Sequence, residues 1–304
     1  MPLKAELHCH NVCSNGNVGA LEPIYDCNVT ISKQLEQAYV AGLDVLFVTN
    51  HNTIDGYKQM LEYKKNHQKF DALNVYPAEE VTTNNESHVL VYGIDHTIKS
   101  GLSLPEILDE VKKQDAVTVA PHPFSLLDAL REDSIYCDLF EVFNSSNIDV
   151  YSNLKAQKFS DEKGLHVVAG SDSHVQSTVG RSTNLIHSDN KLDDVIGAMK
   201  HHKITIDKTA YLQPKEALEH IRYKIENSAF FIDKYTSQFY PRALQPIKLL
   251  YKLYMIDPEG IFWNIFYRMS IFALKRISKK INFEGYDHRL FRERNLVNIL
   301  KMAI

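Results

Sequence analysis

Two histidines flank a cysteine near the N-terminus, in Glu6-Leu7-His8-Cys9-His10 at the end of a short apolar run. In an extended strand alternate side chains share a face, so His8 and His10 point to one side and Cys9 to the other. Two imidazoles side by side at a strand end are suited to binding a metal ion. The pair alone is weak evidence, because such pairs also occur by chance on protein surfaces.

Further histidines and carboxylates stand at the ends of other β-rich runs. They are His51, Glu79, Glu80, His122, Asp172 and His174, and His88 stands at the start of such a run. Imidazoles and carboxylates together suit Mn²⁺, Fe²⁺ or Zn²⁺ rather than Ca²⁺. Ions of this kind can clamp a phosphate and lower the pKa of bound water to about 7. The other eight histidines fall in helical or loop stretches, and we expect them on the solvated surface.

The elements that must position these residues alternate between strands and helices from Leu3 to about Ile206. Strands are predicted at Leu3–His10, Leu43–Asn50, Leu73–Val81, Val89–Ile94, Ala116–Pro121, Leu139–Asn144 and Leu165–Ser171. Helices are predicted at Ser32–Ala41, Leu104–Gln114, Asn153–Lys163 and Lys191–His201. This alternation predicts a mostly parallel sheet covered by helices, open or closed into a barrel. In such folds the chemistry collects at the carboxyl ends of the strands, which is where most of the candidate ligands stand.

Six short motifs, taken in order, resemble the polymerase-and-histidinol-phosphatase (PHP) family of metal-dependent phosphoesterases. They are His8-Cys9-His10, Thr49-Asn50-His51, Pro77-Ala78-Glu79-Glu80, His88-Val89-Leu90, Pro121-His122-Pro123 and Gly170-Ser171-Asp172-Ser173-His174. The resemblance covers roughly residues 3–206. It implies a distorted (β/α)7 TIM-like barrel, with about seven strands and a site for two or three metal ions at its rim.

The resemblance also implies a ligand set for each ion. One ion would be held by His8, His10, Glu80 and Asp172. A second would share Glu80 and take His88 and His122. A third would use His51 and His174 together with a residue of the loop after His10.

Metal-activated water then serves as the nucleophile, so no Ser or Cys nucleophile is needed. The expected catalytic residues are Asp172, Glu80 and His122, and His122 could donate a proton to the leaving group instead of binding metal. Arg181 and Asn144 are candidates for binding the substrate phosphate, because a guanidinium or an amide can donate hydrogen bonds to its oxygens. A solvated loop arginine and a strand-end turn are equally good interpretations of these two residues.

Two positions depart from the pattern of the family. Asn15 stands in a Ser-Asn-Gly tripeptide where the family usually has Asp or His, and Asn50 stands where the family usually has Asp. An Asn side chain is uncharged and is a poor metal ligand. Asn15 is therefore an uncertain third-metal position. We expect the third ion to bind weakly, to be absent, or to be completed by Asp26, Cys13 or water.

The composition changes after about residue 212, which predicts a catalytic barrel over residues 1–212 and a helical extension over residues 213–304. Between residues 242 and 294 there are eleven Lys or Arg against five Asp or Glu, in a chain with a formal net charge of −4. Residues 261–274 are mostly apolar, but polar residues such as Arg268 interrupt them, so no membrane span is expected. The preferred interpretation is a cap on the barrel or a homodimer interface. Peripheral membrane contact and nucleic-acid contact are the alternatives.

The bulk properties exclude several classes of protein. A chain of 304 residues with 44% hydrophobic content can bury the core of one large domain and an appendage. Its four cysteines do not suggest a disulfide framework, and with no secretory segment apparent we expect a cytoplasmic protein. Cys9 and Cys13 lie close enough to the His pair to be ligands, but ordinary thiols are the preferred interpretation. The lack of a Gly-rich phosphate loop or a Gly-x-Ser-x-Gly motif argues against a kinase or a serine hydrolase.

The function predicted from the sequence is that of a metal-dependent phosphoesterase. It would hydrolyse a small phosphorylated metabolite or nucleotide with two or three Mn, Fe or Zn ions. One alternative is a nuclease or exonuclease on single-stranded nucleic acid, held by the basic extension; this partner is not favoured. A second alternative is a metal-binding scaffold with lost catalysis, which Asn15 and Asn50 make worth stating.

Overall fold

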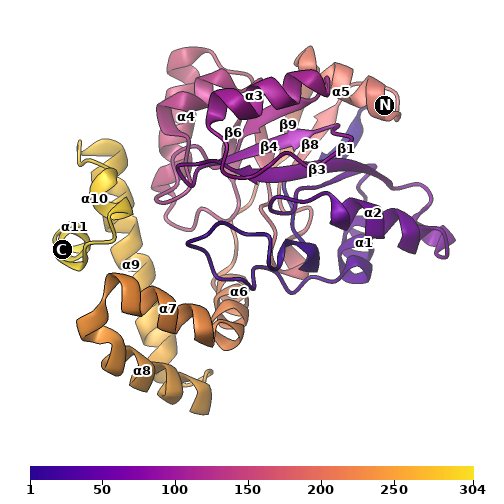
Figure 1. Ribbon diagram of the computed structural model, residues 1–304. Helices are drawn as coiled ribbons and strands as arrows, with labels where there is room; N and C mark the ends of the chain where they lie inside the picture. Colours follow the sequence, from indigo (N-terminus) through magenta and orange to yellow (C-terminus); the bar gives the residue numbers. More distant parts are fainter.

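The computed structural model describes all 304 residues, and its nine-stranded sheet curls into a nearly closed barrel (Figure 1). The strands are β1 (Leu3–Glu6), β2 (Val45–Val48), β3 (Asn74–Thr82), β4 (His88–Tyr92), β5 (Val117–Ala120), β6 (Leu139–Asn144), β7 (Val167–Gly170), β8 (Thr183–Ile186) and β9 (Ile204–Lys208). Their order in the sheet is β7-β6-β5-β4-β3-β2-β1-β8-β9. The edge strands β7 and β9 contact each other without a hydrogen-bond ladder. Near this seam the Asn184 side chain of β8 accepts from the Ala169 amide of β7 at 3.0 Å and donates to the Ala169 carbonyl at 2.7 Å.

Helices cover the outside of the barrel and continue beyond it. The helices between the strands are α1 (Ile31–Val40), α2 (Asp55–Lys64), α3 (Leu104–Lys113), α4 (Tyr151–Lys163) and α5 (Leu192–Lys200). The extension contains α6 (Pro214–Asn227), α7 (Ala229–Phe239), α8 (Leu244–Ile256), α9 (Ile261–Phe283), α10 (Arg289–Arg292) and α11 (Leu296–Ala303). Local signals set several of the ends: Ser103 and Glu106 form a capping box at the start of α3, and α4 ends at Gly164 with a φ of +64°.

The distorted TIM-like barrel with helices beyond it is confirmed, and all seven predicted strands are present. The expectation of about seven strands is wrong, because β8 and β9 complete the sheet. Both are short antiparallel strands, and β9 has exposed residues along its length, so neither carries the long apolar run that marks a buried strand. Helix α2 is also absent from the helices expected from the sequence.

Strand β4 runs antiparallel to both of its neighbours, β3 and β5. The strands β1, β2 and β3 are parallel to one another, as are β5, β6 and β7. The start of β4 therefore lies at the same rim as the ends of β3 and β5. This direction explains why His88 begins its strand while the other candidate ligands follow theirs.

A hydrophobic core fills the barrel below that rim. Phe47 and Tyr92 pack edge to face, with 5.0 Å between ring centroids, and both are fully buried. The Tyr92 hydroxyl donates a hydrogen bond to the Leu7 carbonyl at 2.8 Å, so this buried polar group is satisfied. Close packing under the end of β1 gives His8 and His10 a rigid support.

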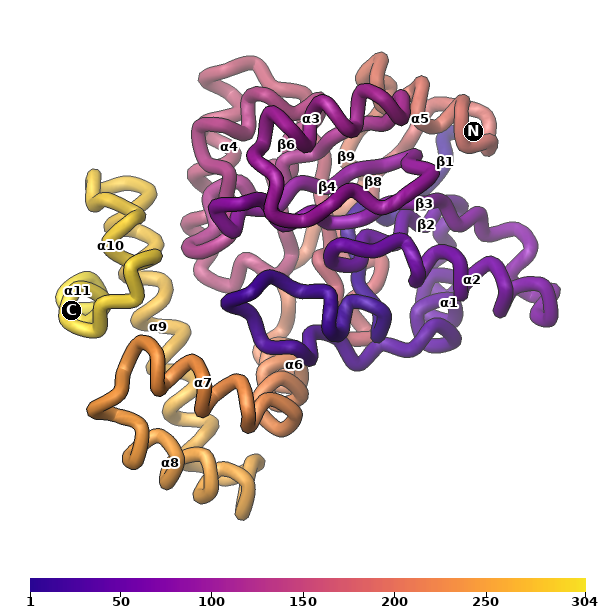
Figure 2. The backbone as a smooth tube through the Cα atoms, viewed as in Figure 1, coloured from indigo at the N-terminus to yellow at the C-terminus, as the bar shows by residue number.

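The helices of the extension lie along one side of the barrel, and α9 leads to α10 and α11 near the C-terminus (Figure 2). Helix α9 packs on α4, where the Ser278 hydroxyl donates to Asp149 Oδ1 at 2.7 Å. Arg131 donates to Asn282 Oδ1 at 2.9 Å from the barrel side. Strand β9 ends and α6 begins on either side of the boundary proposed at residue 212. None of these helices combines the length and apolar character needed to cross a bilayer.

Candidate metal centre

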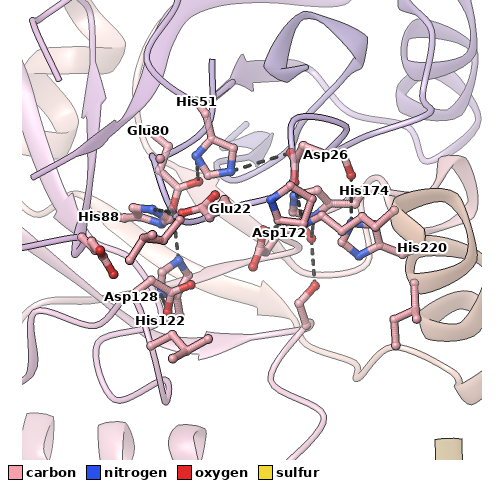
Figure 3. A pocket seen from close by; sticks show the side chains of 18 of the residues that line it. Glu22, Asp26, His51, Glu80, His88, His122, Asp128, Asp172, His174 and His220 are labelled. Carbon is pink, nitrogen blue, oxygen red and sulfur yellow. Dashed lines mark hydrogen bonds and ion pairs between the residues drawn. The ribbon is translucent and has the colours of Figure 1, made fainter. Parts of the chain in front are cut away.

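Glu80, at the rim end of β3, lies among His51, His88 and His122 (Figure 3). Its Oε1 lies 3.0 Å from His88 Nδ1 and 3.1 Å from His122 Nε2. Its Oε2 lies 3.3 Å from His10 Nε2 and 3.5 Å from His8 Nε2. One carboxylate therefore faces two separate groups of imidazoles, each through a different oxygen.

Asp172, in the loop after β7, completes the group formed by His8 and His10. Its Oδ1 lies 3.5 Å from His8 Nε2 and 3.4 Å from His10 Nε2. The structure thus brings together the four residues expected to hold one ion, although they lie up to 164 positions apart in the chain. Their ligand atoms converge from the segment after β1, from β3 and from the loop after β7.

Hydrogen bonds on the far side of each ring fix which nitrogen faces the centre. His8 Nδ1 lies 2.9 Å from Glu141 Oε1, and a carboxylate can only accept, so Nδ1 carries the proton. Ser14 Oγ donates to Asn50 Oδ1 at 3.0 Å and therefore accepts from His10 Nδ1 at 3.2 Å. In both rings the lone pair is left on Nε2, which is the arrangement that metal-binding histidines need. Asn50 thus orients His10 through Ser14.

Several ligand atoms are buried and have no hydrogen-bond partner. They are His8 Nε2, His10 Nε2, His51 Nδ1 and both ring nitrogens of His88. A buried polar atom without a partner costs about 1–3 kcal/mol, so a cluster of them is unfavourable without a ligand. A neutral imidazole has one lone-pair nitrogen, so divalent cations would satisfy one nitrogen of each ring together with the charges of Glu80 and Asp172. The residues present therefore fit two adjoining metal positions.

A third group forms around Asp26, which lies in the loop between the first His pair and α1. Asp26 Oδ2 lies 3.1 Å from His174 Nε2 and 3.7 Å from His51 Nε2. His174 Nδ1 donates to the Asp172 carbonyl at 3.0 Å, so the His174 lone pair on Nε2 faces Asp26. Of the three completions considered from the sequence, Asp26 is the one that the structure places beside both histidines.

Asn15 holds this loop in place and does not face the cluster. Its Oδ1 accepts from the Asp26 and Cys27 amides at 2.7 and 3.0 Å, and its Nδ2 donates to the Cys27 carbonyl at 3.0 Å. The Tyr223 hydroxyl accepts a second bond from Nδ2 at 3.1 Å. The expectation that Asn15 is a third-metal position is therefore wrong. Its amide both donates and accepts hydrogen bonds within the loop, which a carboxylate could not do.

Changing Asn15 to Asp is expected to destabilise the protein without adding a metal ligand. The new carboxylate loses the two donated bonds and faces the Cys27 carbonyl, which should cost roughly 1–3 kcal/mol of the free energy of unfolding. Metal content, measured by mass spectrometry, should not rise. Asn84→Asp changes an exposed side chain that makes no hydrogen bond, so it is the matched control and should leave the melting temperature unchanged. A gain of bound metal in Asn15→Asp would contradict this prediction.

Two site residues have strained backbones. Asp172 has a φ of +49° and His122 a φ of +29°, which cost roughly 1–3 kcal/mol each in residues other than glycine. Hydrogen bonds hold both in place, because the Asp172 amide donates to the His8 carbonyl at 2.7 Å and the His122 amide donates to Glu141 Oε2 at 2.6 Å. Gly170, two residues before Asp172, leaves the space for Glu141: a Cβ there would collide with Oε1 of Glu141.

The electrostatic environment keeps the carboxylates charged. Burial acts to raise the pKa of Glu80, but the nearby histidines, His88 and His8 first, outweigh it and hold that pKa well below its usual range. The pKa of Asp172 is held low in the same way, chiefly by His8. Burial and the neighbouring His174 lower the pKa of His10 to about 3, so His10 is neutral at physiological pH. Charged carboxylates and a neutral imidazole are the forms that bind metals.

Asn144 and Arg181, expected to bind the substrate phosphate, both contact carboxylates of the protein instead. Asn144 is fully buried and donates to Glu141 Oε2 at 2.8 Å and to Asp172 Oδ2 at 3.2 Å, so it orients two carboxylates. Arg181 forms an ion pair with Glu216 of α6 and does not line the cavity over the ligands. Neither side chain is therefore positioned to contact a phosphate there.

The cavity above the ligands has a volume of about 400 Å³ and is lined in part by the extension. Lys224 of α6 is the nearest cation, with its Nζ 2.9 Å from Asp26 Oδ1. Burial acts to lower the pKa of Lys224, but Asp26 outweighs it and raises that pKa. Arg294, which precedes α11, also lines the cavity and lies 3.1 Å from Glu86. These are the two basic side chains that line the cavity.

His220 of α6 corrects the expectation that the remaining histidines are all on the surface. Its ring stacks on that of His174 with 4.4 Å between centroids, and its Nε2 donates to the Asp26 carbonyl at 2.9 Å. The spacing of His220 and Lys224 puts both on one face of α6. That spacing is the only signal in the sequence that this helix reaches the cluster.

Two carboxylates adjoin the group formed by His88 and His122. Asp128 Oδ1 lies 3.4 Å from His122 Nδ1, and Glu22 Oε1 lies 3.3 Å from His88 Nε2. Burial acts to lower the pKa of His122, but Asp128 and Glu80 outweigh it and raise that pKa to about 9. A partner of this kind would either strengthen His122 as a ligand or keep a proton on its ring.

Glu79 points away from the ligands, and its Oε1 accepts a hydrogen bond from the Ile98 amide at 2.6 Å. Burial raises its pKa to about 8, against an ordinary value of 4.5. The folded state keeps the Glu79 carboxyl protonated up to about pH 8, whereas the unfolded state loses that proton near pH 4.5. The contribution of Glu79 to the free energy of unfolding is therefore fully present below pH 4.5 and is lost as the pH rises towards 8.

Glu79→Gln should remove this pH dependence, since an amide keeps the shape and cannot ionise. Between pH 5 and pH 8 the free energy of unfolding of the natural protein should fall by roughly 3 kcal/mol relative to the variant. Urea unfolding at the two pH values measures the difference. Parallel pH profiles for the two proteins would contradict the prediction.

A buried set of imidazoles and carboxylates lies at the rim of this distorted α/β barrel, and several known proteins are similar to the chain in sequence or fold. A family model described as PHP-associated matches residues 150–204. Protein MJ1587 of Methanocaldococcus jannaschii is 31% identical over 165 residues, which cover 53% of this chain and 93% of that protein. Protein MJ0417 of the same organism is 29% identical over 171 residues, which cover 53% of this chain and 65% of MJ0417.

Solved structures share the fold at low identity. The lesion-specific endonuclease PfuEndoQ of Pyrococcus furiosus has a TM-score of 0.53 and 17% identity, covering 70% of this chain and 60% of that one. PsfC of Pseudomonas syringae PB-5123 has a TM-score of 0.50 and 18% identity, covering 75% of this chain and 98% of that one. The chain belongs to the PHP family.

Proposed function

We propose that this chain is a metal-dependent hydrolase that cleaves the phosphate ester of a small metabolite or nucleotide. The observation that carries the proposal is the convergence of buried lone pairs without partners, from His8, His10, His51 and His88, around the carboxylate of Glu80. Such a cluster is costly to fold unless cations bind it. The cluster also opens into a cavity in which a substrate could reach it.

Two or three divalent ions of the Mn, Fe or Zn type fit this donor set. His8, His10, Asp172 and Glu80 would hold one, and Glu80 would share a second with His88 and His122. Asp26, His51 and His174 would hold the third. Ions bound in this way polarise a phosphate ester and lower the pKa of water, which provides the nucleophile at neutral pH.

The chain's own side chains have distinct tasks in this proposal. Lys224 and Arg294 supply the positive charges of the cavity and would bind phosphate oxygens. His122 is either a ligand or, through its contact with Asp128, the holder of a proton for the leaving group. Glu141 and Asn144 keep the ligands oriented through the hydrogen bonds described above.

The size of the cavity favours a small substrate over a nucleic acid. A volume of about 400 Å³ lies within the range of small-molecule sites, and α6 and Arg294 form part of its wall. Nuclease activity is the second candidate, and the excess of basic residues between positions 242 and 294 is the observation that favours it. A scaffold that binds metal without catalysis is the third.

One set of measurements separates these candidates. Metal content is measured after anaerobic purification, and turnover of phosphomonoesters and of short oligonucleotides is measured with added Mn²⁺. The proposal expects bound metal and metal-dependent hydrolysis of phosphomonoesters, reduced at least about a thousandfold in Asp172→Asn. Cleavage of oligonucleotides with binding that falls steeply with salt would identify a nuclease instead. Bound metal with no turnover of any ester would identify a scaffold.

The expected location stays a prediction. The four cysteines are unpaired, and Cys9 donates to the Phe47 carbonyl on the side of β1 away from the ligands. A reducing, cytoplasmic compartment would keep them in this state. Cys13, also considered as a ligand, is half-exposed and is absent from the clustered ligand groups.

A further inference from the structure

The first half of α9 presents an apolar stripe to solvent. The stripe consists of Ile261, Phe262, Ile265, Phe266, Met269 and Phe272. Its members recur at helical spacing, and the exposed fractions of Ile261, Met269 and Phe272 are 79%, 65% and 62%. The opposite face of the helix, which includes Ile277 and Ile281, packs on the protein. The stripe is therefore a second apolar face with no partner in the chain.

Helix α8 adds to this surface. Leu249, Leu250, Leu253 and Ile256 are all exposed. An apolar groove of about 430 Å³ separates α8 from α9, and Leu250, Phe262 and Phe266 stand along it. The groove joins the two exposed faces into one surface. An exposed apolar surface of this extent on a folded protein marks an interaction site.

The charges on these two helices have a single sign. Neither α8 nor α9 contains an Asp or Glu, whereas both contain lysines. On α9 the stripe is continued along the same side by Arg276, Lys279 and Lys280, so an apolar half is followed by a basic half. Of the carboxylates nearby, Glu259 pairs with Arg222 at 2.6 Å and Glu284 with Lys279 at 3.3 Å. Asp257 in the turn between the helices and Glu226 of α6 have no cationic partner. The surface is thus apolar and basic at once.

We propose that the exposed surface of α8 and α9 binds the face of a bilayer that contains anionic lipids. The apolar part of α9 is about 18 Å long at 1.5 Å per residue, which is too short to span a bilayer but suits a helix lying in its interface. The basic half would then contact lipid phosphates. A second copy of the chain is disfavoured as the occupant, because a two-fold contact would bring the same cations face to face.

The proposal goes beyond the proposed function and is independent of it. Ile221 of α6 lines both the apolar groove and the cavity above the metal ligands, so the two hollows adjoin. Lipid binding would therefore hold the cavity close to the membrane surface, whatever ester it accepts. Because binding is measured without turnover, a failure of the hydrolase proposal would leave this test intact.

The test uses the full chain and vesicle flotation. One vesicle is phosphatidylcholine alone, and the other mixes phosphatidylcholine with phosphatidylglycerol. The natural protein should float with the mixed vesicles and much less with the neutral ones, and added salt should weaken the binding. Ile265→Ser/Met269→Ser should lower the partition coefficient at least about tenfold, since exposed apolar side chains drive insertion. Lys252→Gln/Lys279→Gln should lower it roughly fivefold for each cation removed.

The matched control is Val40→Ser/Leu154→Ser, which removes similarly exposed apolar side chains from α1 and α4. It should bind vesicles as the natural protein does, and melting curves should show that all variants are folded. The proposal is overturned if the natural protein does not bind the mixed vesicles or binds neutral ones equally well. It is also overturned if Ile265→Ser/Met269→Ser binds the mixed vesicles as strongly as the natural protein. It is overturned as well if the natural protein is a dimer and this variant is a monomer.

Discussion

Glu80→Gln is expected to lose bound metal and at least about a thousandfold in kcat/KM, since several kcal/mol of charge stabilisation depend on the ions. Both Glu80 oxygens face imidazole nitrogens, Oε1 at 3.0 and 3.1 Å and Oε2 at 3.3 and 3.5 Å. An amide keeps the size of the side chain but removes its charge and replaces one oxygen by a donor. That donor would point at lone pairs that need a cation, so both adjoining metal positions should be weakened together.

Metal per chain and steady-state kinetics on the same preparation measure this effect. Glu79→Gln is the matched control, because it makes the same chemical change one residue away on the opposite face of β3. It should keep its metal content and turnover while changing only the pH dependence of stability. A Glu80→Gln protein with full metal content and full turnover would show that the cluster is not the reacting centre.

Asp26→Asn is the second variant expected to have a large effect. Asp26 is the only carboxylate within 4 Å of both His51 and His174. Its replacement should lower the metal content by the third ion alone, leaving the two ions around Glu80 bound. Loss of a ligand should reduce turnover at least about a hundredfold, since even residues that only orient ligands are worth 10–100-fold.

Asp26 also forms an ion pair with Lys224, so a second variant separates the two roles. Lys224→Met removes the cation and leaves the carboxylate in place. If Lys224 binds the substrate phosphate, this variant should keep its metal content and raise KM roughly tenfold to a hundredfold, the value of a charged hydrogen bond. Equal loss of metal in both variants would indicate that Asp26 acts through Lys224 rather than as a ligand.

The sequence by itself determined the strands of the barrel that carry the candidate ligands and the identity of most of those residues. Short apolar runs fix the strands, and alternation along an extended chain fixes which side chains share a face, so His8 and His10 could be paired without coordinates. The resemblance to the PHP family supplied the grouping around Glu80 and Asp172. Each of these signals is local, either within one strand or within one motif.

The tertiary structure decided the features that depend on direction, loop conformation and distant packing. The antiparallel course of β4 puts His88 at the rim, and no residue pattern within β4 states that direction. The Asn15 amide fixes the loop that carries Asp26. The negative charge that the family pattern places at position 15 is therefore supplied by Asp26, eleven residues later in the chain. Helix α6 brings His220 and Lys224 to the cavity and ties Arg181 to Glu216. Loops and helix docking have no periodicity in sequence, because they are set by contacts between residues far apart in the chain, and these contacts exist only once the barrel has closed.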